Sequence, residues 1–179
     1  MAIEKVKRSA IAHFLDTSKA ADYAEATWKR VGKNVDSAST EYNPQTETEQ
    51  DIISESATTE LTGYQPTMPI SQKCTKGDEV YEFVNGLRRK RSTMSDAHTW
   101  LLNVDLYDKT GSEASATYAA EVQEVSVQVD TYGGDGGDSP VLEYTLNYVA
   151  TRSPGRSPSR PVLPPLPRPP DRRETRWQT

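Results

Sequence analysis

The stretch Ser71 to Arg91, SQKCTKGDEVYEFVNGLRRKR, decides the fold, because it holds the most convincing helical periodicity of the chain. Its apolar residues recur at i, i+3, i+4 and i+7, and they are Val80, Phe83, Val84 and Leu87. That spacing places them on one face of an amphipathic helix. A short helix is stable in water chiefly when its apolar face packs on another element. Since strand-like sequence flanks this one, we expect a helix that lies on a β-sheet.

Both ends of this helix carry signals. Thr75 to Asp78 is typical of a capping box, and the acidic residues at its end favour the helix N-terminus. The basic run Arg88 to Arg91 suits the C-terminus; we interpret it first as solvated charge and second as a contact with an acidic neighbouring subunit. Glycine costs about 1 kcal/mol inside a helix, so the helix either ends at Asn85-Gly86 or continues through it.

Alternating apolar and polar residues predict strands on both sides of the helix. The predicted strands are Ala10 to Leu15, Thr27 to Val35 with a glycine interruption, Asp51 to Thr62, His98 to Tyr107, Tyr118 to Thr131 and Val141 to Val149. Tyr64 to Ser71 contains two prolines and suits a sheet edge at best. The fold class is therefore mainly β, a sandwich or barrel-like arrangement of two antiparallel sheets with one flanking α-helix.

Three local expectations complete this plan. Ser37 to Gln50 is polar and has no apolar face, which predicts a long functional loop. The inward-facing pattern changes parity between Val122 and Val125, which predicts a β-bulge. Gly133 to Asp138 predicts a turn. Apolar residues make up only 34% of the chain, so the core is thin, and we expect neighbouring subunits to complete some strands.

Composition divides the chain into a β domain, residues 1–151, and an Arg/Pro-rich tail, residues 152–179. The tail holds eight of the twelve prolines and seven arginines with two acidic residues, which predicts disorder. The first 151 residues hold 14 basic and 24 acidic residues, a net charge of −10. Such an acidic body argues against ordinary nucleic-acid binding, which depends on neutralising phosphates. No apolar run approaches the roughly 20 residues of a membrane span.

The sequence gives catalysis little support. It has two histidines and one cysteine, without metal-ligand spacing or a nucleophile motif, so we expect no enzyme, no cofactor, no metal site and no small-molecule substrate. Gly133 to Asp138 matches one copy of a calcium-binding repeat that acts in stacked copies, so we favour a hairpin loop. Pro167 to Arg172 fits an SH3-ligand pattern, a match that Pro/Arg-rich tracts also produce by chance.

Taken in order, these segments resemble the tail tube proteins of long-tailed phages with non-contractile tails. The resemblance rests on HFLDT (His13 to Thr17), TWKRVGKNV, NPQTETEQDIISESATTELTGYQPTMPIS (Asn43 to Ser71), KGDEVYEFV (Lys76 to Val84) and EVSVQVDTYGGDGGDSPVLEYTLNYV. It covers about 85% of the chain, from Met1 to roughly Thr151. The Arg/Pro tail departs from the family's usual ending, although some members of the family carry C-terminal extensions.

The resemblance implies a structural virion protein of the viral tail. Six copies of such a protein form a ring, and rings stack by self-assembly into a tube that conducts DNA during ejection. The implied partners are the protein itself as a hexamer, a tape-measure protein, a tail terminator and baseplate or tip proteins. DNA passes without specific binding, no membrane is involved, and assembly takes place in the host cytoplasm. The residues assigned to a ring-stacking loop are Asn43, Pro44, Glu47, Glu49 and Gln50.

Two other functions stay open. One is the tube of a contractile injection system or of type VI secretion, which shares the fold and would be indicated by a neighbouring sheath gene. The other is an adaptor that acts through the Pro/Arg-rich tail, with the body as a scaffold. Loss of all partners on deletion of residues 152–179 would indicate the adaptor.

Overall fold

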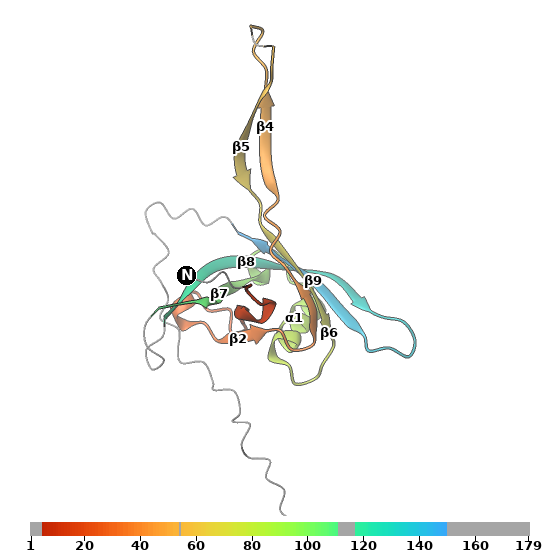
Figure 1. Ribbon diagram of the computed structural model, residues 1–179. Helices are drawn as coiled ribbons and strands as arrows, with labels where there is room; N and C mark the ends of the chain where they lie inside the picture. Colours follow the sequence, from red (N-terminus) through yellow and green to blue (C-terminus); the bar gives the residue numbers. More distant parts are fainter. Residues whose placement is uncertain (1–4, 54, 111–116, 150–179) are drawn as a thin grey trace, which may run out of the picture.

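The computed structural model describes residues 5–53, 55–110 and 117–149. The predicted boundary at Arg152, the tail beyond it and its Pro167 to Arg172 motif lie outside the described residues. The mainly antiparallel β architecture with one helix is confirmed. Seven strands form one curled sheet, and two more form a separate small sheet (Figure 1).

The strands are β1 (Ile11–Asp16), β2 (Trp28–Val31), β3 (Val35–Ala38), β4 (Pro44–Glu49), β5 (Thr58–Tyr64), β6 (Thr67–Lys73), β7 (His98–Thr110), β8 (Thr117–Gly133) and β9 (Val141–Tyr148). The helix is α1 (Glu79–Lys90), and short 3-10 turns are η1 (Arg8–Ala10), η2 (Tyr23–Glu25) and η3 (Met94–Ala97). The large sheet has the order β2-β1-β7-β8-β9-β6-β3, and every pairing in it is antiparallel.

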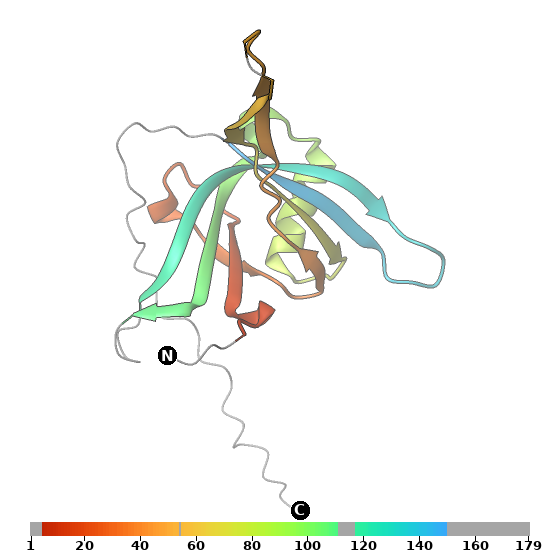
Figure 2. The same cartoon turned by 45° about the horizontal axis from the view of Figure 1, so that its top comes forward.

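The helix packs in the hollow of this curled sheet, as its apolar face predicts (Figure 2). Val80, Val84 and Leu87 are buried, while Phe83 is half-buried against the same cluster. The cluster takes at least one buried residue from each of the seven strands. Burying apolar surface in this way is the dominant favourable term in folding, so α1 supplies much of what holds the curled sheet together.

The N-terminal end of the helix differs from the expectation, and its C-terminal end follows one of the two expected courses. Its N-cap is Asp78 rather than Thr75: Asp78 Oδ1 accepts from Tyr81 N at 2.9 Å and from Gln72 Nε2 at 3.2 Å, which ties the cap to β6. The helix continues through Gly86, one of the two expected courses, and ends at Lys90; the C-cap residue Arg91 has a left-handed conformation with φ 51°. Packing of Val84 and Leu87 on the sheet outweighs the intrinsic cost of Gly86.

A second buried cluster lies on the opposite, convex face of the sheet. It contains Ala12 and Phe14 of β1 with Leu102 and Val104 of β7, flanked by half-buried Trp28, Leu106, Tyr118, Ala120 and Val122. This second cluster shows that the bulge predicted between Val122 and Val125 is wrong. Val122 packs on the convex face and Val125 on the concave face, so the change of parity marks a strand with apolar residues on both faces. The observed irregularities of β8 lie instead between Val129 and Thr131 and opposite Asp105 to Lys109.

Other strand predictions need adjustment. The predicted Thr27 to Val35 strand is in fact two strands, β2 and β3, separated by a turn in which Asn34 has φ 57°.

The proline-containing strand β6 is not at the edge of the sheet, since it lies between β9 and β3. Thr67 N donates to Glu41 O on the side of β6 that faces away from β9. Because backbone nitrogens two residues apart in a strand face the same side, the nitrogen of Pro69 also faces away from β9. β3 ends opposite Ile70, so Pro69 removes no hydrogen bond from a neighbouring strand.

The largest correction concerns Ser37 to Gln50, which is not a loop throughout. Its first residues finish β3, and residues from Pro44 form β4, which pairs with β5 as a hairpin. This β4–β5 hairpin projects away from the body of the molecule (Figure 1). The Asp51 to Thr62 strand is correspondingly shorter and starts at Thr58, because Asp51, Ile52 and Ile53 lie in the connection between β4 and β5.

Candidate functional site

The β4–β5 hairpin is anchored at its base by a compact set of contacts. Asn43 has φ 42°, and its side-chain Nδ2 donates to Gln65 O and to Thr67 Oγ1, both at 3.1 Å. The rings of Tyr42 and Tyr64 meet edge to face with centroids 6.2 Å apart. The left-handed Asn43 and its hydrogen bonds therefore fix where the hairpin leaves the sheet, because an asparagine tolerates that conformation better than most residues.

The hairpin makes few contacts with the body beyond its base. Every residue of β4 is exposed, and so is every residue of β5 except the half-buried Gly63. Two cross-strand side-chain contacts support the ladder: Thr48 and Thr59 hydroxyls lie 3.0 Å apart, and Thr62 Oγ1 donates to Gln45 O at 3.0 Å. A two-stranded hairpin on its own is marginally stable in water, so this one is suited to a partner surface.

Charge and apolar surface are both concentrated on the hairpin. The carboxylates of Glu47, Glu49, Asp51 and Glu60 gather on one side of it, around a shallow hollow. At its tip Ile52 and Ile53 have relative exposures of 105% and 92%, which makes them the two most exposed large apolar side chains described. Adjacent exposed isoleucines at the end of a projecting arm are a feature of interaction sites.

The structure brings the predicted stacking residues together on this hairpin. Asn43 and Pro44 lie at its base, Glu47 and Glu49 on β4, and Gln50 directly after β4. Sequence reasoning missed Ile52 and Ile53 as surface residues, because they fell within the predicted Asp51 to Thr62 strand. Their signal was available: they are a pair of adjacent isoleucines amid threonine, serine and acidic residues.

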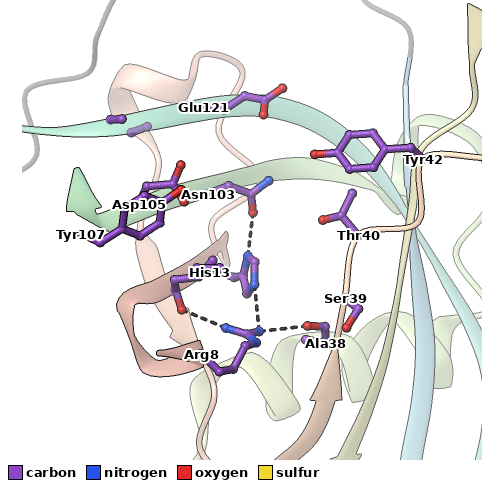
Figure 3. Close-up of a pocket in the computed structure, with 13 residues that line it drawn as sticks. Arg8, His13, Ala38, Ser39, Thr40, Tyr42, Asn103, Asp105, Tyr107 and Glu121 are labelled. Carbon is purple, nitrogen blue, oxygen red and sulfur yellow. Dashed lines mark hydrogen bonds between the residues drawn. The ribbon is translucent and has the colours of Figure 1, made fainter. Parts of the chain in front are cut away.

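A second feature is a polar cavity of about 560 Å³ at the open end of the curled sheet. Figure 3 shows Arg8, His13 and Asn103 on its floor, with Asp105, Tyr107, Glu121 and Tyr42 around them. The imidazole of His13 is buried and hydrogen-bonded on both ring nitrogens, to Arg8 and to Asn103. The cavity thus contains a continuous polar network rather than isolated groups.

The remaining predicted features lie at the surface. Gly134 to Asp138 lie in the loop between β8 and β9, as expected, and Gly133 is the last residue of β8. In the basic run, the Arg88 guanidinium lies 3.8 Å from the centre of the Tyr132 ring and donates to Asn85 Oδ1, while Arg89, Lys90 and Arg91 are exposed.

Among the described residues, no group of three or more His, Cys, Asp or Glu side chains is placed to hold a metal ion. Within the same residues, no helix is long and apolar enough to cross a membrane.

Comparison with known proteins does not assign the chain to a family. No protein-family model matches it, and no curated protein matches its sequence.

Proposed function

We propose that this protein is the structural subunit of a phage tail tube, which polymerises as stacked hexameric rings and forms the conduit for DNA ejection. Its partners in this role are further copies of itself, a tape-measure protein inside the tube, and terminator and tip proteins at the two ends. The observation that carries the proposal is the β4–β5 hairpin, an arm that buries almost nothing of its own.

The hairpin supports self-assembly for an energetic reason. Ordering a chain segment costs roughly 1–2 kcal/mol per residue in backbone entropy, and this arm recovers little of that cost through its own contacts. Fully burying an isoleucine side chain contributes about 1.5–3 kcal/mol. Seating Ile52 and Ile53 against another copy would therefore stabilise the arm and join the subunits in one step.

The charge of the body supports a conduit. With 24 acidic and 14 basic residues in its first 151, the body carries a field that repels phosphate. A wall of such subunits lets DNA pass without holding it. The resemblance of the ordered sequence segments to tail tube proteins supports a tail tube over other assemblies of β-proteins.

Assembly of the purified full-length chain tests the proposal. Concentrated protein is expected to form rings or hollow tubes of uniform diameter in negative-stain electron microscopy. The double variant Ile52→Ser/Ile53→Ser is expected to stay monomeric in sedimentation velocity, with a melting temperature unchanged from wild type. Met94→Ser is the matched control, because Met94 is an 85% exposed apolar side chain away from the hairpin, and it should assemble normally.

The outcomes separate the parts of the proposal. A wild-type chain that stays monomeric at every concentration, and is absent from the tubes of virions, rejects the tube function. Tubes that form equally well from the double-serine variant leave the tube in place but exclude the hairpin tip as its stacking contact. Tubes found inside a contractile sheath would assign the chain to a contractile system instead.

A further inference from the structure

Arg8 joins two distant parts of the curled sheet at the open end of its hollow. Its Nη2 lies 2.9 Å from Ala38 O at the end of β3 and 3.0 Å from His13 Nε2 on β1, and its Nη1 donates to Ile11 O at 2.9 Å (Figure 3). β1 and β3 are not neighbours in the sheet, since the four strands β7, β8, β9 and β6 separate them in its order. On the other side of β1 lies β2, which ends one edge of the sheet, while β3 ends the other. Arg8 is thus a clamp between them.

The partners of His13 fix its protonation state. A guanidinium can only donate, so His13 Nε2 accepts from Arg8 and carries no proton. The ring proton then lies on Nδ1 and is donated to Asn103 Oδ1 at 2.8 Å. Asn103 Nδ2 donates in turn to Tyr148 Oη at 3.0 Å. The network runs from β3 through Arg8, His13 and Asn103 to β9, and it is complete only with a neutral imidazole.

We propose that His13 is a proton-operated latch, whose protonation at Nε2 detaches Arg8 from Ala38 and loosens both the N-terminal segment and the end of β3. Protonated Nε2 would direct an N–H at the N–H of Arg8, and two positive charges would lie about 3 Å apart. Both effects oppose the clamp. Asn103 keeps its hydrogen bond from Nδ1 in either state, so the change is confined to the side of the ring that faces Arg8.

The surroundings of His13 contain charges of both signs. The titratable groups that line the cavity around it come from four segments and are Arg8, Tyr42, Asp105, Tyr107 and Glu121. Tyr148 of β9 is reached through Asn103. Burial of the imidazole, with help from the Arg8 charge, holds the pKa of His13 below its ordinary 6.5, against opposing effects of Asn103 and Asp105. The latch is therefore closed at neutral pH.

The sign of the pH effect follows from that lowered pKa. Below pH 6.5 the unfolded chain binds a proton at this histidine before the folded chain does, so stability falls as the pH drops. The loss of stability is complete once the pH is below the pKa of His13 in the folded protein. The latch opens as the pH falls through that pKa. This inference concerns the single folded subunit and does not rest on the proposed tube.

Two-dimensional NMR of the histidine Cε1–Hε1 groups in the full-length protein tests the latch. The chain has two histidines, and His98→Gln identifies the signal of His13. We expect His13 to titrate below pH 6.5, and its midpoint to rise toward 6.5 in Arg8→Gln, which replaces the charged guanidinium by a shorter, neutral amide. A wild-type midpoint at or above 6.5, or one that Arg8→Gln leaves unchanged, overturns the proposal.

Hydrogen exchange across the pH range, corrected for intrinsic rates, tests the opening itself. Segments 5–12 and 35–42 should lose protection by about tenfold below the His13 midpoint, as expected for one hydrogen bond from a charged donor. His13→Gln should remove this pH dependence, while His98→Gln should keep it, because His98 pairs with Glu124 at a different place. If protection in wild type is constant across the His13 titration, protonation does not open the clamp, and the latch is rejected even where the glutamine variant fails to fold.

Discussion

Glu47 on β4 lies directly opposite Glu60 on β5 in the antiparallel register of the hairpin. Like charges in directly opposed positions destabilise a strand pair, and both side chains are exposed. The hairpin is therefore less stable on its own than its threonine-rich ladder would allow. An arm that tolerates this repulsion is suited to a partner surface that supplies cations to the two carboxylates.

The opposed pair gives a direct test of hairpin stability. Glu60→Lys replaces the repulsion by an attraction and should stabilise the strand pair by about 0.5–1 kcal/mol at low salt. Amide exchange of residues 45–49 should slow correspondingly, and the gain in stability should shrink in 1 M salt because the charges are exposed. Glu41→Lys, outside the β4–β5 ladder, is the control and should leave exchange in the hairpin unchanged. Equal exchange in wild type and Glu60→Lys would show that the repulsion is negligible.

Asp16 should be a main determinant of acid stability. Its buried carboxylate accepts hydrogen bonds from Ser18 N, Ser18 Oγ and Thr27 N on one oxygen and from Ala20 N on the other. Burial opposes its ionisation, but these hydrogen bonds outweigh burial and hold the pKa of Asp16 below its usual 3.8. Asp16→Asn directs an NH2 group at one of these donors and should cost about 2–3 kcal/mol at pH 7.

The pH dependence of that cost has a definite sign. Because the pKa of Asp16 is lowered in the folded protein, its ionised carboxylate contributes fully to the free energy of unfolding above pH 3.8. That contribution is lost as the pH falls through the pKa of Asp16 in the folded protein. Urea unfolding of wild type and Asp16→Asn at pH 7 and at low pH measures it, and the difference between their free energies of unfolding should narrow at low pH. Asp22→Asn, which changes an exposed aspartate of the same segment, is the control. A constant difference across this range would show that the Asp16 charge is not the cause.

The helix face should respond to truncation according to burial. Val84 is completely buried and Phe83 only half-buried. Val84→Ala should destabilise by about 2 kcal/mol. Phe83→Ala should cost less than the roughly 3–5 kcal/mol of a fully buried phenylalanine. Arg89→Ala, on the exposed side, should stay within about 0.5 kcal/mol. Chemical denaturation measures the free energy of unfolding of all three variants. A value for Val84→Ala equal to that of wild type would show that α1 does not pack in the hollow of the sheet.

The C-terminus of α1 offers a stabilising substitution. Arg91 is left-handed with φ 51°, and the bonds Arg91 N to Arg88 O and Ser92 N to Leu87 O close the helix around it. A non-glycine residue in this conformation costs roughly 1–2 kcal/mol. Arg91→Gly should therefore raise stability by about 0.5–1 kcal/mol after the entropy lost by glycine. Arg89→Gly, inside the helix, should instead lower it by about 1 kcal/mol, and the two melting temperatures should move in opposite directions.

Periodicity along the chain was enough to predict the amphipathic helix and the strands that carry the core. The i, i+3, i+4, i+7 spacing from Val80 to Leu87 identifies the buried helix face, and the alternation in β9 identifies Leu142, Tyr144 and Leu146 as buried. These signals are local, because a side chain's direction follows from the helical or strand period alone. The same local periodicity also determines the fold class.

Tertiary structure alone decided the rest. The apolar residues of β8 point to two different cores, and Pro69 is tolerated inside the sheet because β3 ends beside it. The polar segment before Gln50 becomes a strand only because β5 supplies hydrogen-bond partners. Both faces of this strand are exposed, so its sequence shows no alternation of apolar and polar residues that would predict the pairing. The clamp of Arg8 on His13 and Ala38 likewise depends on the curling of the sheet, which brings residues thirty positions apart into contact.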